Sequence, residues 1–232
     1  MSLPNDLPND LPNASSTAAR HTVRTALAPM NGEPRISTSL TSQLLAGDVV
    51  AAIETRGDWL QVCSEDGYEG WTHAGYLMPS TGSEASWRIS LGCVVRDGTG
   101  VAYPLPLGAR IRPSSEILSG ETVAADERST RFRSTAAAIA AGAGTLYGGA
   151  SYLWGGVSQW GCDCSGFVQR IFALHGVRLP RDAWQQATTG AQVDGDASAP
   201  HQEADLLFFT DREDRRVTHV GIALGEIGRA HV

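Results

Sequence analysis

Turn residues recur at about ten-residue spacing in the first part of the chain, and this spacing constrains its fold most strongly. The turns are Gly47-Asp48, Arg56-Gly57-Asp58 and Glu65-Asp66-Gly67. Between them stand two short runs rich in β-branched and aromatic residues, Val49 to Ile53 and Trp59 to Val62. Short strands separated by regular tight turns are typical of small all-β barrels. We therefore expect an all-β domain over residues 21–80.

Helical signals replace the turns after residue 130. The stretch "STAAAIAAGAGTLYG" is rich in alanine and predicts a helix capped by Ser134 or Thr135. In "CSGFVQRIFALHG" the apolar residues repeat with helical spacing and a glycine ends the run, which predicts an amphipathic helix. Two strands, residues 205–210 and 217–224, flank the charged turn "DREDRR" and are expected to pair antiparallel. Helices followed by strands predict an α+β domain over residues 131–232.

Composition and net charge indicate which binding partners and which cellular compartment to expect. Residues 1–20 repeat Leu-Pro-Asn-Asp and are expected to form a disordered leader, since they lack the basic start and apolar core of a secretory signal peptide. The net charge of -7 argues against nucleic acid or an anionic membrane as the main partner. No apolar run is long enough for a transmembrane helix. The cytoplasm is the expected compartment, with the cell envelope as the alternative, and the sequence does not indicate an oligomeric state.

Two of the four cysteines, Cys162 and Cys164, stand one residue apart, immediately before the second predicted helix. A disulfide between them would close a very small, strained ring. A zinc site needs about four ligands, and no second pair at ligand spacing follows, although His219 and His231 could contribute. Two buried core thiols are the plainest alternative. The remaining interpretation is one nucleophile beside a bystander, with no metal and no cofactor.

The nucleophile interpretation places Cys164 at the first turn of the predicted helix. Unpaired backbone N–H groups and the positive helix end would favour the thiolate, lowering the thiol pKa from its usual value of about 8.5. The same N–H groups could hold an oxyanion. His219, on the last predicted strand, would supply the base that a thiol nucleophile needs. A lone histidine on a strand is more often an ordinary polar residue of the sheet, so the residues alone leave both interpretations open.

The first part of the chain resembles a bacterial SH3-like domain. In "AGDVVAAIETRGDWLQVCSEDGYEGWTHAGYL" the blocks G-[DE]-x-V, G-D-W-x-x-V and G-Y-x-G-W of that family occur in order. "LPLGARI" is similar to the "LLAGDVV" of this first copy. A second, degenerate all-β SH3-like barrel is therefore expected over residues 81–130.

The C-terminal part resembles the NlpC-type cysteine peptidases of bacterial cell-wall metabolism. The likeness rests on "YLWGG", "DCSGFVQ", "PRDAWQQ", "DLLFF" and "HVGI", which occur in that family's order. It implies a papain-like α+β catalytic domain with Cys164 as nucleophile, His219 as general base and Tyr152 at the oxyanion site. It further implies that four polar residues bind the substrate peptide: Asp163, Ser165, Arg181 and Asp182. Cys162 matches no family position and is interpreted as a bystander.

With SH3-like modules in front, the chain is similar to the γ-D-glutamyl-L-diamino acid endopeptidase subgroup. This resemblance implies cleavage between D-Glu and the diamino acid of murein stem peptides. Free recycled peptides are the expected substrates because no signal peptide is present. The resemblance also implies that an acidic and a tyrosine side chain of the first SH3-like domain bind the N-terminal amine of L-Ala, and the matching positions are Glu33 and Tyr68. A carboxylate would pair well with that ammonium in a closed pocket.

Three departures from the family pattern stand out. Ala183 replaces a small hydroxyl residue, and Ala204 stands where a turn glycine is usual, which strains the backbone if φ is positive. The chain ends in "EIGRAHV", which can be back-translated into a common sequencing-library adapter. We therefore expect the natural part of this sequence to stop near Gly225, the tail after it to be an artefact, and the catalytic domain to be truncated. His231, which has the family's spacing for the residue that orients the catalytic imidazole, would then be an artefact.

Two other functions remain open on the sequence. The SH3-like pair could bind murein while the truncated peptidase domain is inactive. Alternatively, the same Cys–His pair could serve an amidase or an acyltransferase.

Overall fold

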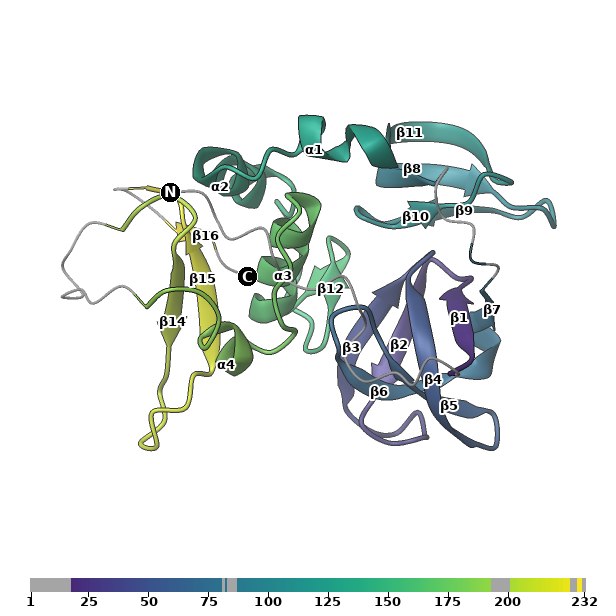
Figure 1. Ribbon diagram of the computed structural model, residues 1–232, viewed down its shortest axis with the longest axis horizontal. Helices are drawn as coiled ribbons and strands as arrows, with labels where there is room; N and C mark the ends of the chain where they lie inside the picture. The colour runs from purple at the N-terminus through teal and green to yellow at the C-terminus, as the bar shows by residue number, and fades with distance from the viewer. Residues whose placement is uncertain (1–17, 81, 83–86, 193–200, 226–228, 231–232) are drawn as a thin grey trace. The chain divides into compact units, whose positions relative to one another are not determined.

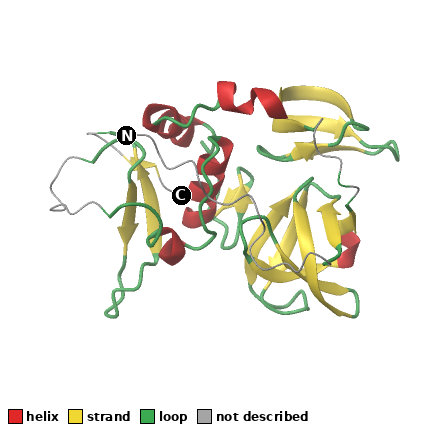
Figure 2. Cartoon of the chain, viewed as in Figure 1, coloured by secondary structure: helices red, strands yellow, loops and turns green. Residues whose placement is uncertain are grey.

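The computed structural model describes residues 18–80, 82, 87–192, 201–225 and 229–230 (Figure 1). These residues divide into two compact units. The first, here called the β unit, contains the described residues between 18 and 131 and the segment Trp154–Val157. The second, here called the α+β unit, contains the described residues of Phe132–Leu153 and Ser158–Val232. Figure 2 shows that the β unit consists mainly of strands, whereas the two longest helices belong to the α+β unit.

A seven-stranded antiparallel sheet forms the first part of the β unit, with the strand order β3-β2-β6-β5-β4-β1-β7. Its elements are β1 (Arg20–Val23), β2 (Leu27–Asn31), β3 (Leu40–Leu45), β4 (Val49–Arg56), β5 (Trp59–Cys63), β6 (Glu69–His73), the 3₁₀ turn η1 (Ala74–Tyr76) and β7 (Leu77–Pro79). All three predicted turns connect consecutive strands, and Gly47, Gly57 and Gly67 have φ values of 80°, 58° and 83°. Glycine is favoured at these turns because other residues rarely adopt positive φ.

A buried apolar cluster holds this sheet together. Its members are Val23, Ala28, Met30, Leu44, Val50, Val62 and Leu77. Ala28 and Met30 alternate along β2, as expected where one face of a sheet covers the core. The predicted all-β fold of this region is confirmed.

A four-stranded sheet completes the β unit, with β8 (Arg88–Arg96) at its centre. Its other elements are β9 (Ala102–Leu105), β10 (Arg110–Ile111) and β11 (Glu116–Ala124), followed by the 3₁₀ turn η2 (Ala125–Glu127) and α1 (Arg128–Arg131). One apolar cluster joins the two sheets, because Leu45 and Ala46 pack with Cys93 and Val95. Residues 88–124 are thus all-β as expected, and their likeness to an SH3 barrel stays a prediction.

The α+β unit contains two longer helices. α2 (Ala136–Thr145) begins after Thr135, whose Oγ1 accepts a hydrogen bond from Ala138 N at 3.4 Å, so one of the two predicted caps is confirmed. α3 (Cys164–Leu174) is the predicted amphipathic helix, and its apolar residues Phe167, Ile171 and Leu174 are buried. The remaining elements are β12 (Val157–Ser158), β13 (Gly161–Cys162), α4 (Ala183–Gln186), β14 (Leu206–Phe209), β15 (His219–Ala223) and β16 (Arg229–Ala230). Among the described residues, no helix has the length and apolarity needed to cross a bilayer.

A small antiparallel sheet with the order β14-β15-β16 packs against α3 through β15. The two strands predicted at 205–210 and 217–224 are confirmed as β14 and β15. β16 lies beyond Gly225 and pairs with β15, a strand that the sequence does not predict. The position of the natural C-terminus stays a prediction.

Ala204, which stands at the family's glycine position, has a φ of 65°. Its N–H donates to the carbonyl of Ala223 at 2.9 Å, so the sheet fixes this conformation. A residue with a Cβ loses about 1–2 kcal/mol in a left-handed conformation, and a glycine at this position would avoid that cost. Glycine, however, loses more conformational freedom on folding, which cancels about half of the gain. Ala204→Gly is therefore expected to raise the free energy of unfolding by about 0.5–1 kcal/mol in denaturant titrations. Ala141→Gly, at an exposed position inside α2, is the matched control and should lower it by about the same amount.

Candidate active site

The start of α3 positions Cys164 directly after β13. Asp163 is the N-cap residue, with an extended backbone and a carboxylate that accepts a hydrogen bond from Gly166 N at 2.7 Å. Aspartate is favoured at this position because its side chain satisfies a free N–H of the first turn. The sequence "DCSG" therefore makes Cys164 the first helical residue, and this residue is 6% exposed.

The Cys164 thiol is held mainly in its protonated form. Burial is the largest influence and raises its pKa, the backbone N–H of Val220 lowers it, and the Asp163 carboxylate raises it. The expectation that the helix start lowers this pKa is wrong as a net effect, because the loss of water outweighs hydrogen bonding to the thiolate. Such a thiol needs a base before it can attack a carbonyl group.

Strand β15 brings the candidate base to this site. The N–H of Val220 interacts with the Cys164 thiol, and His219 is the residue immediately before it. His219 is opposite Phe209 of β14, and the two ring centroids are 5.9 Å apart. Val220 and Ile222 are fully buried, which fixes the strand against the core. The structure thus places the two predicted catalytic residues on packed elements, and their chemical roles stay predictions.

Arg181 is buried beside Cys164, with 2% of its side chain exposed. Its guanidinium donates to both carboxylate oxygens of Asp163, at 2.7 and 3.0 Å, and to Ser165 Oγ at 2.9 Å. Bidentate arginine–carboxylate pairs fix geometry as well as charge. Three of the residues predicted to bind substrate are therefore hydrogen-bonded to one another, because Arg181 holds Asp163 and Ser165, the two neighbours of Cys164. This geometry favours a positioning role for them.

Gln186 is a second buried residue that holds the segment after Cys164, and it is not among the site residues predicted from the sequence. Its Nε2 donates to the carbonyl of Ser165 at 3.1 Å and to that of Pro180 at 2.8 Å. The residue is fully buried at the end of α4. The only signal for it in the sequence is the glutamine that closes the block "PRDAWQQ".

Tyr152 lies next to the strand that leads into Cys164. It forms an isolated parallel bridge with Cys162, and the following N–H, of Leu153, donates to the Cys162 carbonyl at 2.9 Å. Burial raises the pKa of the phenol, and the nearby Cys164 raises it further, so the hydroxyl keeps its proton. The side chain is 54% exposed and can donate a hydrogen bond to a ligand.

The other cysteine of the pair is a buried thiol. Cys162 has no exposed surface, and burial, followed by the Asp163 carboxylate, raises its pKa to about 12. All four cysteines of the chain are free, so the disulfide interpretation is wrong.

Within the ranges that the structure describes, no three histidine, cysteine, aspartate or glutamate side chains are grouped to hold a metal ion.

Asp182 is the N-cap residue of α4 and forms a capping box with Gln185. Burial raises the pKa of its carboxyl group, while the charge of Arg181 and a hydrogen bond from Trp184 lower it. The carboxyl group of Asp182 therefore caps α4, and its contact with substrate stays a prediction.

The remaining predicted residues lie elsewhere. Glu33 belongs to the β unit and pairs with Arg35 at 2.8 Å on its surface. Tyr68 belongs to the same unit and packs against the core of the seven-stranded sheet. Their role in binding an amine stays a prediction. His231 lies outside the described residues.

Comparisons with known proteins identify two parts of the chain. Residues 149–230 match the NlpC/P60 family, and residues 32–74 match the family described as bacterial dipeptidyl-peptidase Sh3 domain. A γ-D-glutamyl-L-lysine dipeptidyl-peptidase of Bacillus cereus is 27% identical over 240 residues, which are 83% of this chain and 67% of the relative. The protein of the same name from Bacillus subtilis is 43% identical over 83 residues, 35% of this chain and 27% of the relative.

A solved structure supports the same fold. The crystal structure of an NlpC/P60 family protein from Bacillus cereus superposes with a TM-score of 0.73 and covers 90% of this chain and 88% of its own, at 20% sequence identity. The predicted α+β fold class with an NlpC-type catalytic domain and an SH3 domain is thereby confirmed. The chain spans about two thirds of the Bacillus cereus dipeptidyl-peptidase and about a quarter of the Bacillus subtilis protein.

Proposed function

The chain carries an NlpC/P60 peptidase domain at residues 149–230 and a bacterial SH3 domain at residues 32–74, and from this we propose that it is a cysteine peptidase acting on murein stem peptides. The bond hydrolysed is the one between the γ-carboxyl group of D-Glu and the amino group of the diamino acid. Cys164 is the nucleophile and His219 the general base.

One observation carries this proposal. Cys164 is the buried first residue of α3, and its thiol interacts with the N–H of Val220, the residue next to His219. Cysteine-dependent acyl transfer needs a thiol, a histidine base and donors for the oxyanion, and N–H groups at the start of a helix can supply the last. The buried contacts of Arg181 with Asp163 and Ser165 hold this arrangement in place.

The reaction follows from these groups. His219 takes the proton of the Cys164 thiol as the sulfur attacks the γ-carbonyl carbon of D-Glu. Backbone N–H groups at the start of α3 and the Tyr152 hydroxyl stabilise the oxyanion that forms. His219 then gives the proton to the leaving amine of the diamino acid, and a thioester remains. Water, deprotonated by His219, hydrolyses the thioester and frees the thiol.

The substrates proposed are free recycled peptides with an N-terminal L-Ala. Support comes from two relatives named γ-D-glutamyl-L-lysine dipeptidyl-peptidase and from the match of Glu33 and Tyr68 to the family's amine-binding positions. A carboxylate and a phenol hydroxyl are suited to bind an ammonium group.

A peptide panel tests the proposal. The wild-type protein is incubated with L-Ala-γ-D-Glu-diaminopimelate, with the N-acetylated form of that peptide and with the α-linked isomer, and the products are identified by mass spectrometry. We expect cleavage of the first peptide between D-Glu and the diamino acid. The N-acetylated form should be cut at least about tenfold more slowly, since it has no ammonium to pair. The α-linked isomer should stay intact.

Each alternative has its own outcome. Equal rates for the free and N-acetylated peptides would refute the amine requirement and leave the peptidase in place. No cleavage of any peptide, together with retention on murein sacculi, would favour a binding protein with an inactive peptidase domain. Turnover only in an amide or lipid ester panel would favour an amidase or an acyltransferase.

A further inference from the structure

A cation–π contact joins the β14–β15 hairpin to α4. The guanidinium carbon of Arg216, on the hairpin, lies 5.5 Å from the centroid of the Trp184 ring, on α4. Trp184 is 43% exposed, and Arg216 is exposed as well. A guanidinium stacked on an aromatic face loses little hydration and keeps its N–H groups at the edge free to donate.

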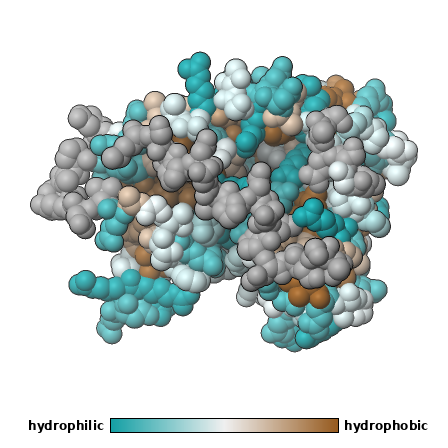
Figure 3. Space-filling model, viewed as in Figure 1, coloured by the Kyte–Doolittle hydropathy of each residue, from teal (hydrophilic) through white to brown (hydrophobic). Residues whose placement is uncertain are grey.

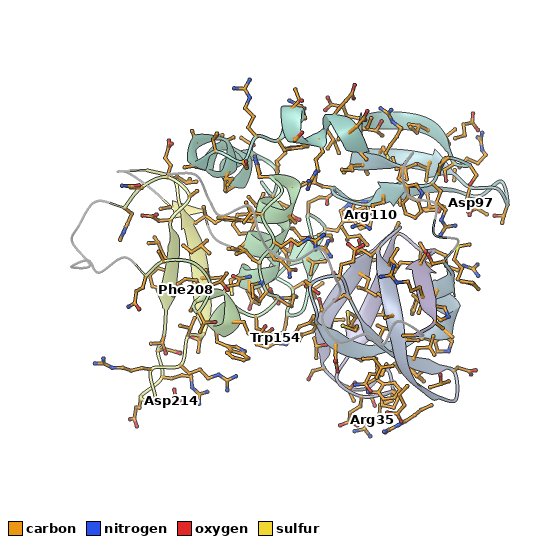
Figure 4. The ribbon with its side chains drawn as sticks, in the orientation of Figure 1. Arg35, Asp97, Arg110, Trp154, Phe208 and Asp214 are labelled. Carbon is orange, nitrogen blue, oxygen red and sulfur yellow. The ribbon has the colours of Figure 1, made fainter. Side chains whose placement is uncertain are left out.

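The hairpin holds the backbone of Arg216 on both sides. Its N–H donates to Asp214 Oδ1 at 3.0 Å, and its carbonyl accepts from Thr210 Oγ1 at 2.6 Å. Thr218 N donates to the carbonyl of Phe209 at 2.9 Å, which closes the hairpin. Figure 4 shows Asp214 at the tip of this hairpin, and Figure 3 shows the tip as a hydrophilic surface. Arg216 is therefore pre-organised rather than carried on a free loop.

The guanidinium of Arg216 is exposed to solvent. In the part of the chain that the structure describes, its guanidinium forms no ion pair, whereas Arg212 on the same hairpin pairs with Asp214 at 3.0 Å. Two carboxyl groups lie within electrostatic reach of it: that of Asp182, which is partly buried, and that of Asp214 at the hairpin tip. Burial raises the pKa of Asp182, whereas Arg181, Trp184 and, least, Arg216 lower it. An exposed guanidinium fork with fixed orientation suits a carboxylate, which it binds through two parallel hydrogen bonds.

Both partners of the contact are close in sequence to the catalytic groups. Arg216 precedes His219 by three residues on the same hairpin arm. Trp184 follows Arg181 by three residues, and Arg181 holds the residues on either side of Cys164. The Arg216–Trp184 pair thus joins the segment that carries His219 to the segment that carries Arg181.

We propose that Arg216, stacked on Trp184, binds the side-chain carboxylate of the diamino acid and so selects diaminopimelate over lysine. The side chain of diaminopimelate ends in an ammonium and a carboxylate, whereas that of lysine ends in an ammonium alone. A fixed guanidinium attracts the first and repels the second, which gives discrimination in both directions. This inference rests on the proposed function and names the substrate class of the same site.

The test is the ratio of kcat/KM for L-Ala-γ-D-Glu-meso-diaminopimelate to that for L-Ala-γ-D-Glu-L-lysine, measured on the full chain. Wild type should prefer the diaminopimelate peptide at least about tenfold, the factor expected for one charge-assisted pair. Arg216→Gln should lose that preference, because it slows cleavage of the diaminopimelate peptide and, by removing the repulsion, leaves cleavage of the lysine peptide unchanged or faster. Trp184→Leu, which removes the ring under the guanidinium, should lower the ratio in the same direction. Arg212→Gln, the matched control on the same hairpin, should keep the wild-type ratio.

The outcomes separate this inference from the function beneath it. Cleavage of both peptides with an unchanged ratio in Arg216→Gln, or a wild-type preference for lysine, would overturn the role of Arg216 and leave the peptidase standing. Failure of the wild-type protein to cut either peptide would overturn both. Thermal midpoints of all variants, measured in parallel, identify any loss of activity that comes from unfolding.

Discussion

Arg181→Met is expected to lower the free energy of unfolding of the α+β unit by about 3–5 kcal/mol. The guanidinium is 2% exposed and forms two hydrogen bonds with Asp163 and one with Ser165. Its removal leaves the Asp163 carboxylate buried without its cation, and an unpaired buried charge is costly. Because Asp163 also caps α3, the start of the helix that carries Cys164 should loosen first.

Hydrogen exchange of the α3 amides measures the loss of stability in the α+β unit separately from that of the β unit. Exchange of the most protected amides should accelerate by a factor that corresponds to the lost stability. Arg212→Met is the control, because the Arg212–Asp214 pair is more than half exposed on both sides, and exposed ion pairs contribute little to stability. Adding Asp163→Asn to Arg181→Met should recover part of the loss by removing the stranded charge. Equal effects of Arg181→Met and the Arg212 control would show that the buried pair does not hold the site.

His219→Ala is expected to lower kcat/KM on γ-D-glutamyl peptides by about 10³-fold or more. The reason lies in the thiol: burial raises the pKa of Cys164. A thiol is neutral below its pKa, so a raised value leaves less thiolate at neutral pH, and the thiolate fraction grows only as the pH rises through that value. Without His219 to accept the proton, the nucleophile stays protonated under working conditions.

Alkylation of Cys164 by iodoacetamide, followed by pH and located by mass spectrometry, checks this step. In the wild type the rate should be appreciable near neutral pH, whereas in His219→Ala it should stay low there and rise only in the alkaline range. Cys162, whose pKa is raised to about 12, serves as an internal reference that stays unlabelled across the same range. Identical pH profiles for the wild type and His219→Ala would contradict the assignment of His219 as the base.

Local signals predict the elements correctly. Turn glycines at positions 47, 57 and 67 predict the first sheet because positive φ is a local requirement. The spacing of Phe167, Ile171 and Leu174 predicts α3 because one face of a helix must reach the core. The backbone strain at Ala204 also follows from one residue and its neighbours.

Long-range contacts are what the sequence does not predict. The pKa of Cys164 depends on how completely β15 and α3 exclude water, which raises it. The sequence shows only that Cys164 stands at a helix start, where the backbone N–H groups lower the pKa. The role of Arg181 depends on a pair that spans 18 positions in the chain. Trp154–Val157, inside the catalytic region of the sequence, belongs to the β unit, where Val157 N donates to Gln43 Oε1 at 3.2 Å. Such contacts depend on tertiary packing, which no local pattern encodes.

The central claim, that Cys164 performs the chemistry, is tested most directly by cleavage of L-Ala-γ-D-Glu-diaminopimelate by Cys164→Ala and Cys162→Ala. The two variants each remove one sulfur from buried positions two residues apart. We expect Cys164→Ala to lose activity by about 10⁴-fold or more, the loss typical of a removed nucleophile. Cys162→Ala should keep activity within about tenfold, because its only predicted effect is a small packing defect. Comparable activity of Cys164→Ala and the wild type, or loss of activity in Cys162→Ala alone, would contradict the assignment of the nucleophile.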